Sequence, residues 1–380
     1  MKKRIVIISA LTLLGAITLQ LLLLMVYLLA FHAPKADKLP IIVQGNPDAV
    51  GSIAQTLEKN SGGAYAVSVE SDNDVAQDKL RRQEAFAIYA PAFPRSSITV
   101  ATASGRAVRA QVEPSLAKFD ESYQKKVRVE LAGSSDYRLV AQANAYIEAP
   151  SVQDIAPLSE GDQGGIGLFY VAFSAVFGGY LAAVALNLVR SKMEFRSQLT
   201  LLRSLGLALS AVLTSLTTAG IATYLTGAFA PDHFWPIAGI TALTYLGVSL
   251  FASALVSLMG IFGTALVIVL FVILGTPASG GVMPIELTGQ GLWRSLAPLL
   301  PTGAGFSAMR QAIYFGGVDI MRHLWVLICY VVVGFGALLL ARRSHRSSAD
   351  LLEDGELDDA DRARLARVKQ WIMHSLGRHK

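Results

Sequence analysis

Residues 236–275 read PIAGITALTYLGVSLFASALVSLMGIFGTALVIVLFVILG, forty positions without an Asp, Glu, Lys, Arg or His. A helix needs about 20 apolar residues to cross the hydrocarbon core of a bilayer. This stretch is therefore long enough for two spans. A break that includes Ser257 and Gly260 lies past its centre, and we expect two membrane helices that turn there.

Four further apolar stretches raise the number of spans to six. Of all residues, 53% are hydrophobic and 16% are charged, which is far from the composition of a soluble protein. The pattern predicts a multi-pass α-helical membrane protein with six transmembrane helices. Besides the two helices within 236–275, we expect spans at residues 5–31, 166–189, 204–230 and 324–341.

The first span is either a retained membrane anchor or a secretory signal, because Lys2, Lys3 and Arg4 give it the positive start of both. Its apolar part has 27 residues, whereas the apolar region of a signal peptide has roughly 7–15. No clean small-residue cleavage site follows it. We therefore expect residues 1–33 to form an N-terminal transmembrane anchor.

Basic residues flank the spans at three places, before the first, between the second and third, and after the sixth. The positive-inside rule then predicts a plasma (inner) membrane protein with both termini cytoplasmic and residues 34–165 extracytoplasmic. The net charge of +5 is concentrated in these flanks, which indicates membrane lipid as its partner and no nucleic acid. The flanking residues are Lys2, Lys3, Arg4, Arg190, Lys192, Arg196, Arg203, Arg342, Arg343 and Arg346.

The segment between the first two spans, residues 34–165, has the pattern of an α/β domain. Its first part alternates short apolar runs with amphipathic stretches of helical period. Such alternation favours a small layered domain around a central sheet. The expected strands are 39–43, 66–69 and 85–90, and the expected helices are 49–59 and 72–82.

The second half of this domain is less regular. Residues 98–101 and 106–112 are expected to be strands and 115–131 a helix. Residues 141–149 fit either a continuation of that helix or a strand. From 150 to 165 the composition shifts to Pro, Gly, Ser and acidic residues, which is typical of a linker.

The chain carries no recognisable catalytic chemistry. No segment matches the phosphate-binding pattern GxxxxGK[ST], and the six histidines have no metal-ligand spacing. We expect no catalytic residue, no metal and no cofactor in this chain. The predicted spans contain no ionisable side chain, which disfavours coupling to protons or sodium. A transporter built this way would take its energy from another polypeptide.

Two segments near the second span have a recognisable pattern. Ser174, Gly178 and Ala182 recur every fourth residue, so a neighbouring helix can approach closely along that face. Residues 190–203, RSKMEFRSQLTLLR, form the longest cytoplasmic link between spans. This link is either a positive-inside loop with an interfacial helix or a docking helix for a cytoplasmic partner.

The loop from 276 to 322 is rich in Gly and Pro yet apolar. A fully solvated loop would be more polar. We expect short helices folded back into the outer membrane surface, broken at Pro298, Pro301 and Gly303, with the irregular backbone sheltered by protein.

Residues 342–380 are expected to form a cytoplasmic amphipathic tail. An acidic stretch at 350–361 precedes a basic stretch at 362–380. The basic stretch is either an amphipathic helix on the inner leaflet or a solvated tail whose two halves pair electrostatically.

Three short motifs in the outer loop carry a family resemblance. They are PASGGVMP at 277–284, PLLPTGAGFSAMR at 298–310 and YFGG at 314–317. Together with one span, a large outer domain and five clustered spans, they resemble type-2 ABC transporter (ABC-2) permeases, and most closely the YhgE/Pip-like branch. The resemblance covers the whole architecture, although its sharp motifs lie within the outer loop, and Thr276 stands where Asn is expected.

The resemblance implies a permease subunit that is not itself an enzyme. It implies a homodimer or heterodimer of permeases, a separate cytoplasmic ABC ATPase, and export of a hydrophobic or amphipathic substrate such as a drug, lipid or envelope component. The link after the second span would be the coupling helix, with Arg190, Lys192, Glu194 and Arg196 docking the ATPase. The outer gate would contain Pro277, Gly280, Gly281, Pro301, Gly303 and Arg310.

A different class of function stays open at this point. Members of the YhgE/Pip-like branch often lack an obvious ATPase, so the chain could instead be a non-transporting membrane scaffold or surface receptor. Its outer domain would then bind an envelope partner.

Overall fold

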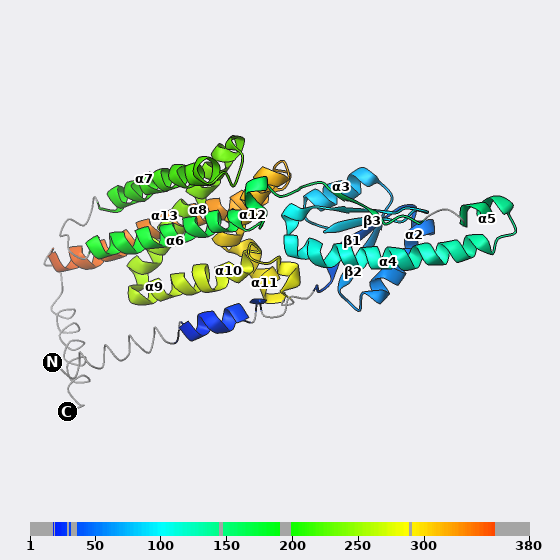
Figure 1. Cartoon of the computed structure of the whole chain (residues 1–380). Coiled ribbons are helices and arrows are strands. Elements are labelled where there is room, and N and C mark those ends of the chain that lie inside the picture. The colour runs from blue at the N-terminus through cyan, green and yellow to red at the C-terminus, as the bar shows by residue number, and fades with distance from the viewer. Residues whose placement is uncertain are drawn as a thin grey trace, which may run out of the picture.

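The computed structural model describes residues 18–353, apart from 19, 29, 32–35, 144–146, 191–198 and 289–290. Figure 1 shows an elongated molecule with long helices at one end and a sheet covered by helices at the other. The helix that contains residues 20–28 runs beside the long helices, and the sheet follows it in the chain. The α/β part and the helical part are therefore distinct bodies.

The α/β domain begins with the predicted alternation of strands and helices. Asn46 caps the first of these helices by accepting a hydrogen bond from the Asp48 backbone N–H at 3.0 Å, and Asp72 caps the second by accepting one from Asp74 at 2.8 Å. Glycines at 62 and 63 end the first helix with positive φ. The elements are β1 (Leu39–Gln44), α2 (Pro47–Asn60), β2 (Tyr65–Glu70), α3 (Asn73–Arg81) and β3 (Ala87–Ala90).

Five strands form one mixed sheet in the order β2-β1-β3-β4-β5. The strands β2 and β3 are both parallel to β1, whereas β4 (Ser97–Val100) runs antiparallel to β3. The edge strand β5 (Ser151–Asp154) is parallel to β4. The predicted linker at 150–165 was thus wrong at its start, because its first residues complete the sheet.

Residues 106–112 are helical, and the strand predicted there was wrong. They begin α4 (Arg106–Ala132), whose second half is the helix predicted at 115–131. Val108, Val112 and Leu116 lie on one buried face at a spacing of four, which short-range alternation at 106–112 concealed. The undecided segment 141–149 includes the end of α5 (Tyr137–Ala143) and, from 147 onward, residues without regular secondary structure.

Helices cover both faces of the sheet. On one face Leu39, Ile41 and Val43 pack against α2 and α4. On the other face Ile42 and Ile88 pack against α3. Successive residues of a strand point to opposite faces, so the apolar runs of β1 and β3 fill two separate cores.

Among the described residues, four helices are long and apolar enough to cross a membrane. The apolar helix Phe262–Ala278 is shorter, and most of the first predicted span lies outside the described residues. The turn predicted near Gly260 is confirmed, because Gly260 separates two helices at φ +59°. The long helices are α6 (Gly167–Arg190), α7 (Leu199–Gly220), α8 (Phe234–Met259) and α13 (Ile320–Glu353), and α9 (Ile261–Val267) follows Gly260.

The helix α8 lies at the centre and contacts α6, α7, α12 (Pro301–Tyr314) and α13. Small residues permit the close approach. A Cβ on Gly179 of α6 would lie 2.7 Å from the Tyr245 carbonyl oxygen, and one on Gly334 of α13 would lie 2.5 Å from the Phe251 nitrogen. Of the predicted stripe, Ser174 is exposed and Gly178 faces the Tyr245 ring, so the tightest contact lies one residue further along.

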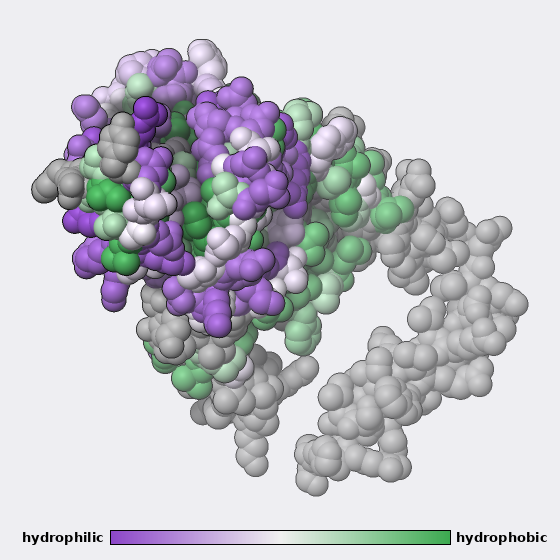
Figure 2. Space-filling view, turned by 90° about the vertical axis from the view of Figure 1, so that its right-hand side faces the viewer, coloured by the Kyte–Doolittle hydropathy of each residue, from purple (hydrophilic) through white to green (hydrophobic). Residues whose placement is uncertain are grey.

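The outer faces of these helices are apolar. Leu205 and Leu209 of α7 and Val332 of α13 are more than half exposed. Figure 2 shows hydrophilic residues gathered over the α/β domain and hydrophobic ones on the helical part behind it. Such a division matches a helical part surrounded by lipid and an α/β part in water.

Replacing Gly179 with Ala should destabilise the protein by about 1–3 kcal/mol, because the added Cβ meets the backbone of α8 rather than a side chain able to move. Thermal unfolding of the full chain in detergent would measure this. Gly206→Ala in α7 is the matched control, because nothing lies within 4 Å of its Cβ and alanine favours the helix. Equal melting temperatures for the two variants would contradict the close packing of α6 on α8.

Candidate functional site

The segment 275–315, here called the junction segment, lies between the long helices and the α/β domain (Figure 1). It consists of short helices, as predicted for this loop. They are α10 (Gly275–Ala278), α11 (Gly291–Leu296), α12 (Pro301–Tyr314) and two 3-10 turns (Ile285–Leu287 and Ala297–Leu299). This is the only segment after residue 166 that contributes buried side chains to the cores of the α/β domain among the described residues.

The junction segment inserts side chains into both cores of that domain. Leu287 is fully buried in the core between the sheet and α4, with Met283 packed beside it. Phe315, directly after α12, is buried in the core on the α3 side with Leu80 and Ala103. The domain is therefore held from the two faces of its sheet, which restricts its rotation relative to the membrane helices.

Polar contacts from α12 reinforce this attachment. Arg310 donates from Nη1 to the Ser104 carbonyl oxygen at 3.2 Å and from Nη2 to Gln83 Oε1. The Gln311 side chain donates to the Arg81 carbonyl oxygen at 3.3 Å. These bonds join α12 to the end of α3 and to the turn before α4, two loops at one end of the sheet.

The chain returns from the sheet to α6 through residues 155–166, here called the return segment. The hydroxyls of Ser159 and Tyr314 lie 3.1 Å apart, which connects this segment to α12. Asp162 Oδ2 accepts from the Gly167 N–H at 2.9 Å and so caps α6. Burial raises the pKa of the Asp162 carboxyl, although the backbone N–H groups that it accepts from oppose the shift.

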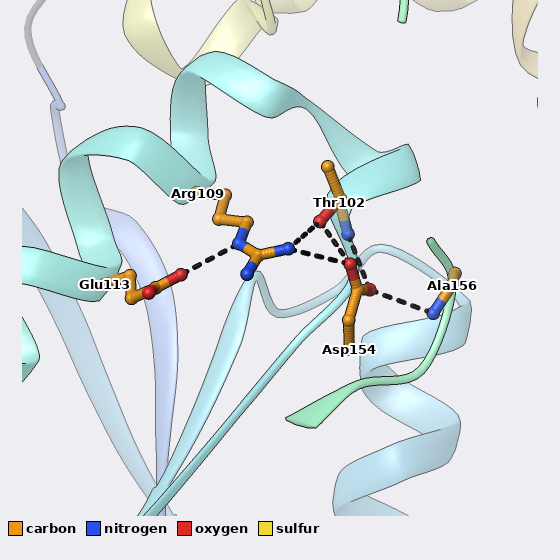
Figure 3. Close-up of polar contacts among 5 residues, drawn as sticks. All are labelled: Thr102, Arg109, Glu113, Asp154 and Ala156. Carbon is orange, nitrogen blue, oxygen red and sulfur yellow. Dashed lines mark hydrogen bonds and ion pairs between the residues drawn. The ribbon is translucent and has the colours of Figure 1, made fainter. Parts of the chain in front are cut away.

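A charged network fastens the start of the return segment (Figure 3). Arg109 of α4 donates to Asp154 Oδ2 at 2.9 Å, to Thr102 Oγ1 at 2.7 Å and to Glu113 at 2.8 Å. Asp154 also accepts from the backbone N–H groups of Thr102 at 3.1 Å and Ala156 at 3.2 Å. One carboxylate thus joins β5, α4 and the turn at Thr102, directly beside the junction segment.

The predicted outer-gate residues all lie in the junction segment. Pro277 is buried in α10, and Gly280 follows it at φ +71°. Gly281 lies against Phe169 of α6, where a Cβ would approach to 2.7 Å. Pro301 begins α12 after Leu300, which is extended.

The break predicted at Gly303 was wrong. Gly303 lies inside α12, where the absence of a side chain leaves room for the Ala297 carbonyl oxygen. The irregular backbone is instead at residues 279–284. Of the predicted docking residues, Arg190 ends α6, and Lys192, Glu194 and Arg196 lie outside the described residues.

Comparison with protein families identifies the chain. Residues 6–340 match the family described as ABC-2 family transporter protein. The chain belongs to the ABC-2 transporter family. It is therefore the membrane-transport component of an ABC transporter, and its family implies a partnership with an ABC ATPase subunit. The predicted membership among ABC-2 permeases is confirmed. The narrower likeness to the YhgE/Pip branch stays a prediction, and a comparison with curated proteins finds no match.

Sequence reasoning missed several residues that build this site. Phe315 and Leu287 look like interface anchors or loop residues in the sequence, because their partners in the α/β domain are more than about 150 positions away. The Arg109–Asp154 pair is separated by 45 residues. The only signal in the sequence was the apolar character of the 276–322 loop. It indicates that the loop is buried but does not identify the residues that it packs against.

Asp154→Ala should loosen the return segment, because two backbone N–H groups and the Arg109 guanidinium lose a charged acceptor, at a cost of roughly 2–3 kcal/mol. We expect faster amide hydrogen exchange over residues 151–166. Glu148→Gln is the matched control, because the Arg95–Glu148 ion pair is about half exposed and should contribute little. Unchanged exchange in the Asp154 variant would refute the fastening role.

Proposed function

We propose that the chain is the permease subunit of an ATP-driven exporter of a hydrophobic or amphipathic substrate. The observation that carries the proposal is the family match over residues 6–340, which includes the α/β domain as well as the apolar helices. The chain lacks the phosphate-binding pattern of an ATPase, so a separate subunit supplies the energy. A homodimer or heterodimer of permeases would surround the path.

The proposed topology has six spans, with both termini cytoplasmic and residues 34–165 outside the cell. Four long helices and the shorter Phe262–Ala278 support five of the spans, and residues 5–31 supply the sixth. The hydrophilic surface of the α/β domain supports a position in water (Figure 2). The basic residues at 190–203 support a cytoplasmic link.

In this proposal, force from the ATPase enters at the coupling helix within 190–203 and moves α6 and α7. The junction segment responds because Gly281 and Phe169 join it to α6. The α/β domain follows because Phe315 and Leu287 lie inside its cores. The outer gate, formed by α10 to α12, then opens or closes as α6 tilts.

Reversing the charges of Arg190, Lys192 and Arg196 to Glu should abolish co-purification of the ATPase, because a docking surface then repels its partner. Affinity purification in mild detergent with mass spectrometry and an ATPase assay would measure this. The matched control reverses Lys118, Lys125 and Lys126, which are exposed on α4. Retained ATPase in the first variant would remove the coupling assignment, and its absence from the unaltered chain would favour the scaffold or receptor function.

The topology is testable by cysteine labelling, because Cys329 is the single cysteine. In a Cys329→Ser background, Lys118→Cys on α4 should react with a membrane-impermeant maleimide in intact cells. Ser348→Cys, beyond the last span, should react only after the cells are permeabilised. The opposite pattern would invert the proposed orientation.

A further inference from the structure

A cleft of about 310 Å³ lies where the α/β domain meets the junction segment. The turn at Thr102 and the start of α4 form one wall, and residues 280–284 with α12 form the other. The return segment closes it between Leu158 and Ile166. Residues from three distant parts of the chain line it, and they include the proposed outer-gate residues Gly280, Gly281 and Arg310.

Arg310 lines the cleft and carries a charge that no carboxylate neutralises within 4.0 Å among the described residues. Its Nε is buried without a hydrogen-bond partner, and the Phe306 ring lies 4.8 Å from the guanidinium. Burial lowers the pKa of Arg310 to about 10. This pKa is still well above neutral pH, so the side chain stays positive there. Arg310 is partly buried, and its two Nη atoms already donate to the Ser104 carbonyl oxygen and to Gln83 Oε1. These neutral acceptors leave the charge in place. A cation partly removed from water without an opposite charge is costly, and a bound anion would reduce that cost.

The neighbouring groups favour an anion as well. Arg106 lies on the rim and donates to the Gln163 carbonyl oxygen at 3.0 Å. Three carboxylates are close. Asp154 pairs with Arg109, Asp162 caps α6, and Glu286 acts on Arg310 only at longer range.

Two apolar side chains are exposed on the rim of the cleft. Val282 and Ile166 both line the cleft, with exposed fractions of 43% and 37%. The volume is at the lower end of small-molecule sites, so it suits a headgroup rather than a whole lipid. A ligand with an anionic head and an apolar chain would contact Arg310 inside and Val282 at the rim.

We propose that this cleft, here called the junction cleft, binds the phosphate or carboxylate headgroup of an anionic amphiphile. Arg310 and Arg106 hold the head through charge-assisted hydrogen bonds, and the chain leaves over Val282 and Ile166. The evidence for the site is the geometry of the cleft. Whether its ligand is an exported substrate or a bound outer-leaflet lipid rests on the proposed function.

Binding of dodecyl phosphate to the full chain in an uncharged detergent, followed by native mass spectrometry, tests the proposal. Dodecanol should bind at least tenfold more weakly because it lacks the charge. Inorganic phosphate should also bind at least tenfold more weakly because it lacks the chain. Equal affinity for dodecanol would overturn the anion assignment, and equal affinity for inorganic phosphate would overturn the amphiphile assignment.

Variants locate the site. Arg310→Gln should weaken dodecyl phosphate binding at least tenfold, and Arg310→Lys should restore part of it because the charge remains. Val282→Asp places a repelling carboxylate at an exposed rim position, so it should weaken binding without unfolding the protein. Arg95→Gln, an arginine away from the cleft lining, should leave binding unchanged.

Undiminished binding by both folded Arg310→Gln and Val282→Asp would overturn the site. The measurement needs no ATPase, so absence of an ATPase partner would refute the proposed function without changing this result.

Discussion

The insertion of the junction segment into both faces of one sheet is the contact on which the rest of the arrangement depends. Leu287 lies in one core and Phe315 in the other. A hydrophobic contact on one face alone would leave the domain free to pivot about it. With contacts on both faces, the α/β domain moves with α12, and α12 packs against α8 and α13.

The chain crosses between the helical part and the α/β domain twice, and both connecting stretches contact the junction segment. The connection into β1 reaches it at Asp37, whose carbonyl oxygen accepts from Arg294, and the return segment reaches it at Tyr314. The Arg109–Asp154 network then fastens the return segment to α4 (Figure 3). A displacement of α6 therefore acts on the sheet edge through residues 155–166 and on its cores through α12, and the junction cleft lies between these two routes.

The irregular backbone directly before the junction segment lies where protein supplies hydrogen bonds. The π-helical stretch Ile268–Leu274 offers carbonyl oxygens to other helices, since Phe271 accepts from Thr302 and Val272 from Tyr27, each at 3.3 Å. Unpaired polar backbone is costly in hydrocarbon. This constraint explains why the helix before the junction segment can be interrupted without facing lipid.

The sequence by itself determined the apolar helices, the break at Gly260 and the alternating first half of the α/β domain, because each depends on residues close together in the chain. Period and length carry that information. Local periodicity was insufficient at 106–112, where a short apolar run fits the period of a helix and that of a strand. It was also insufficient at β5, which is a strand only because β4 lies beside it. The tertiary structure alone decided that Phe315, Leu287 and Arg310 serve the distant α/β domain, because contacts across hundreds of positions depend on how the chain folds back and leave no local pattern.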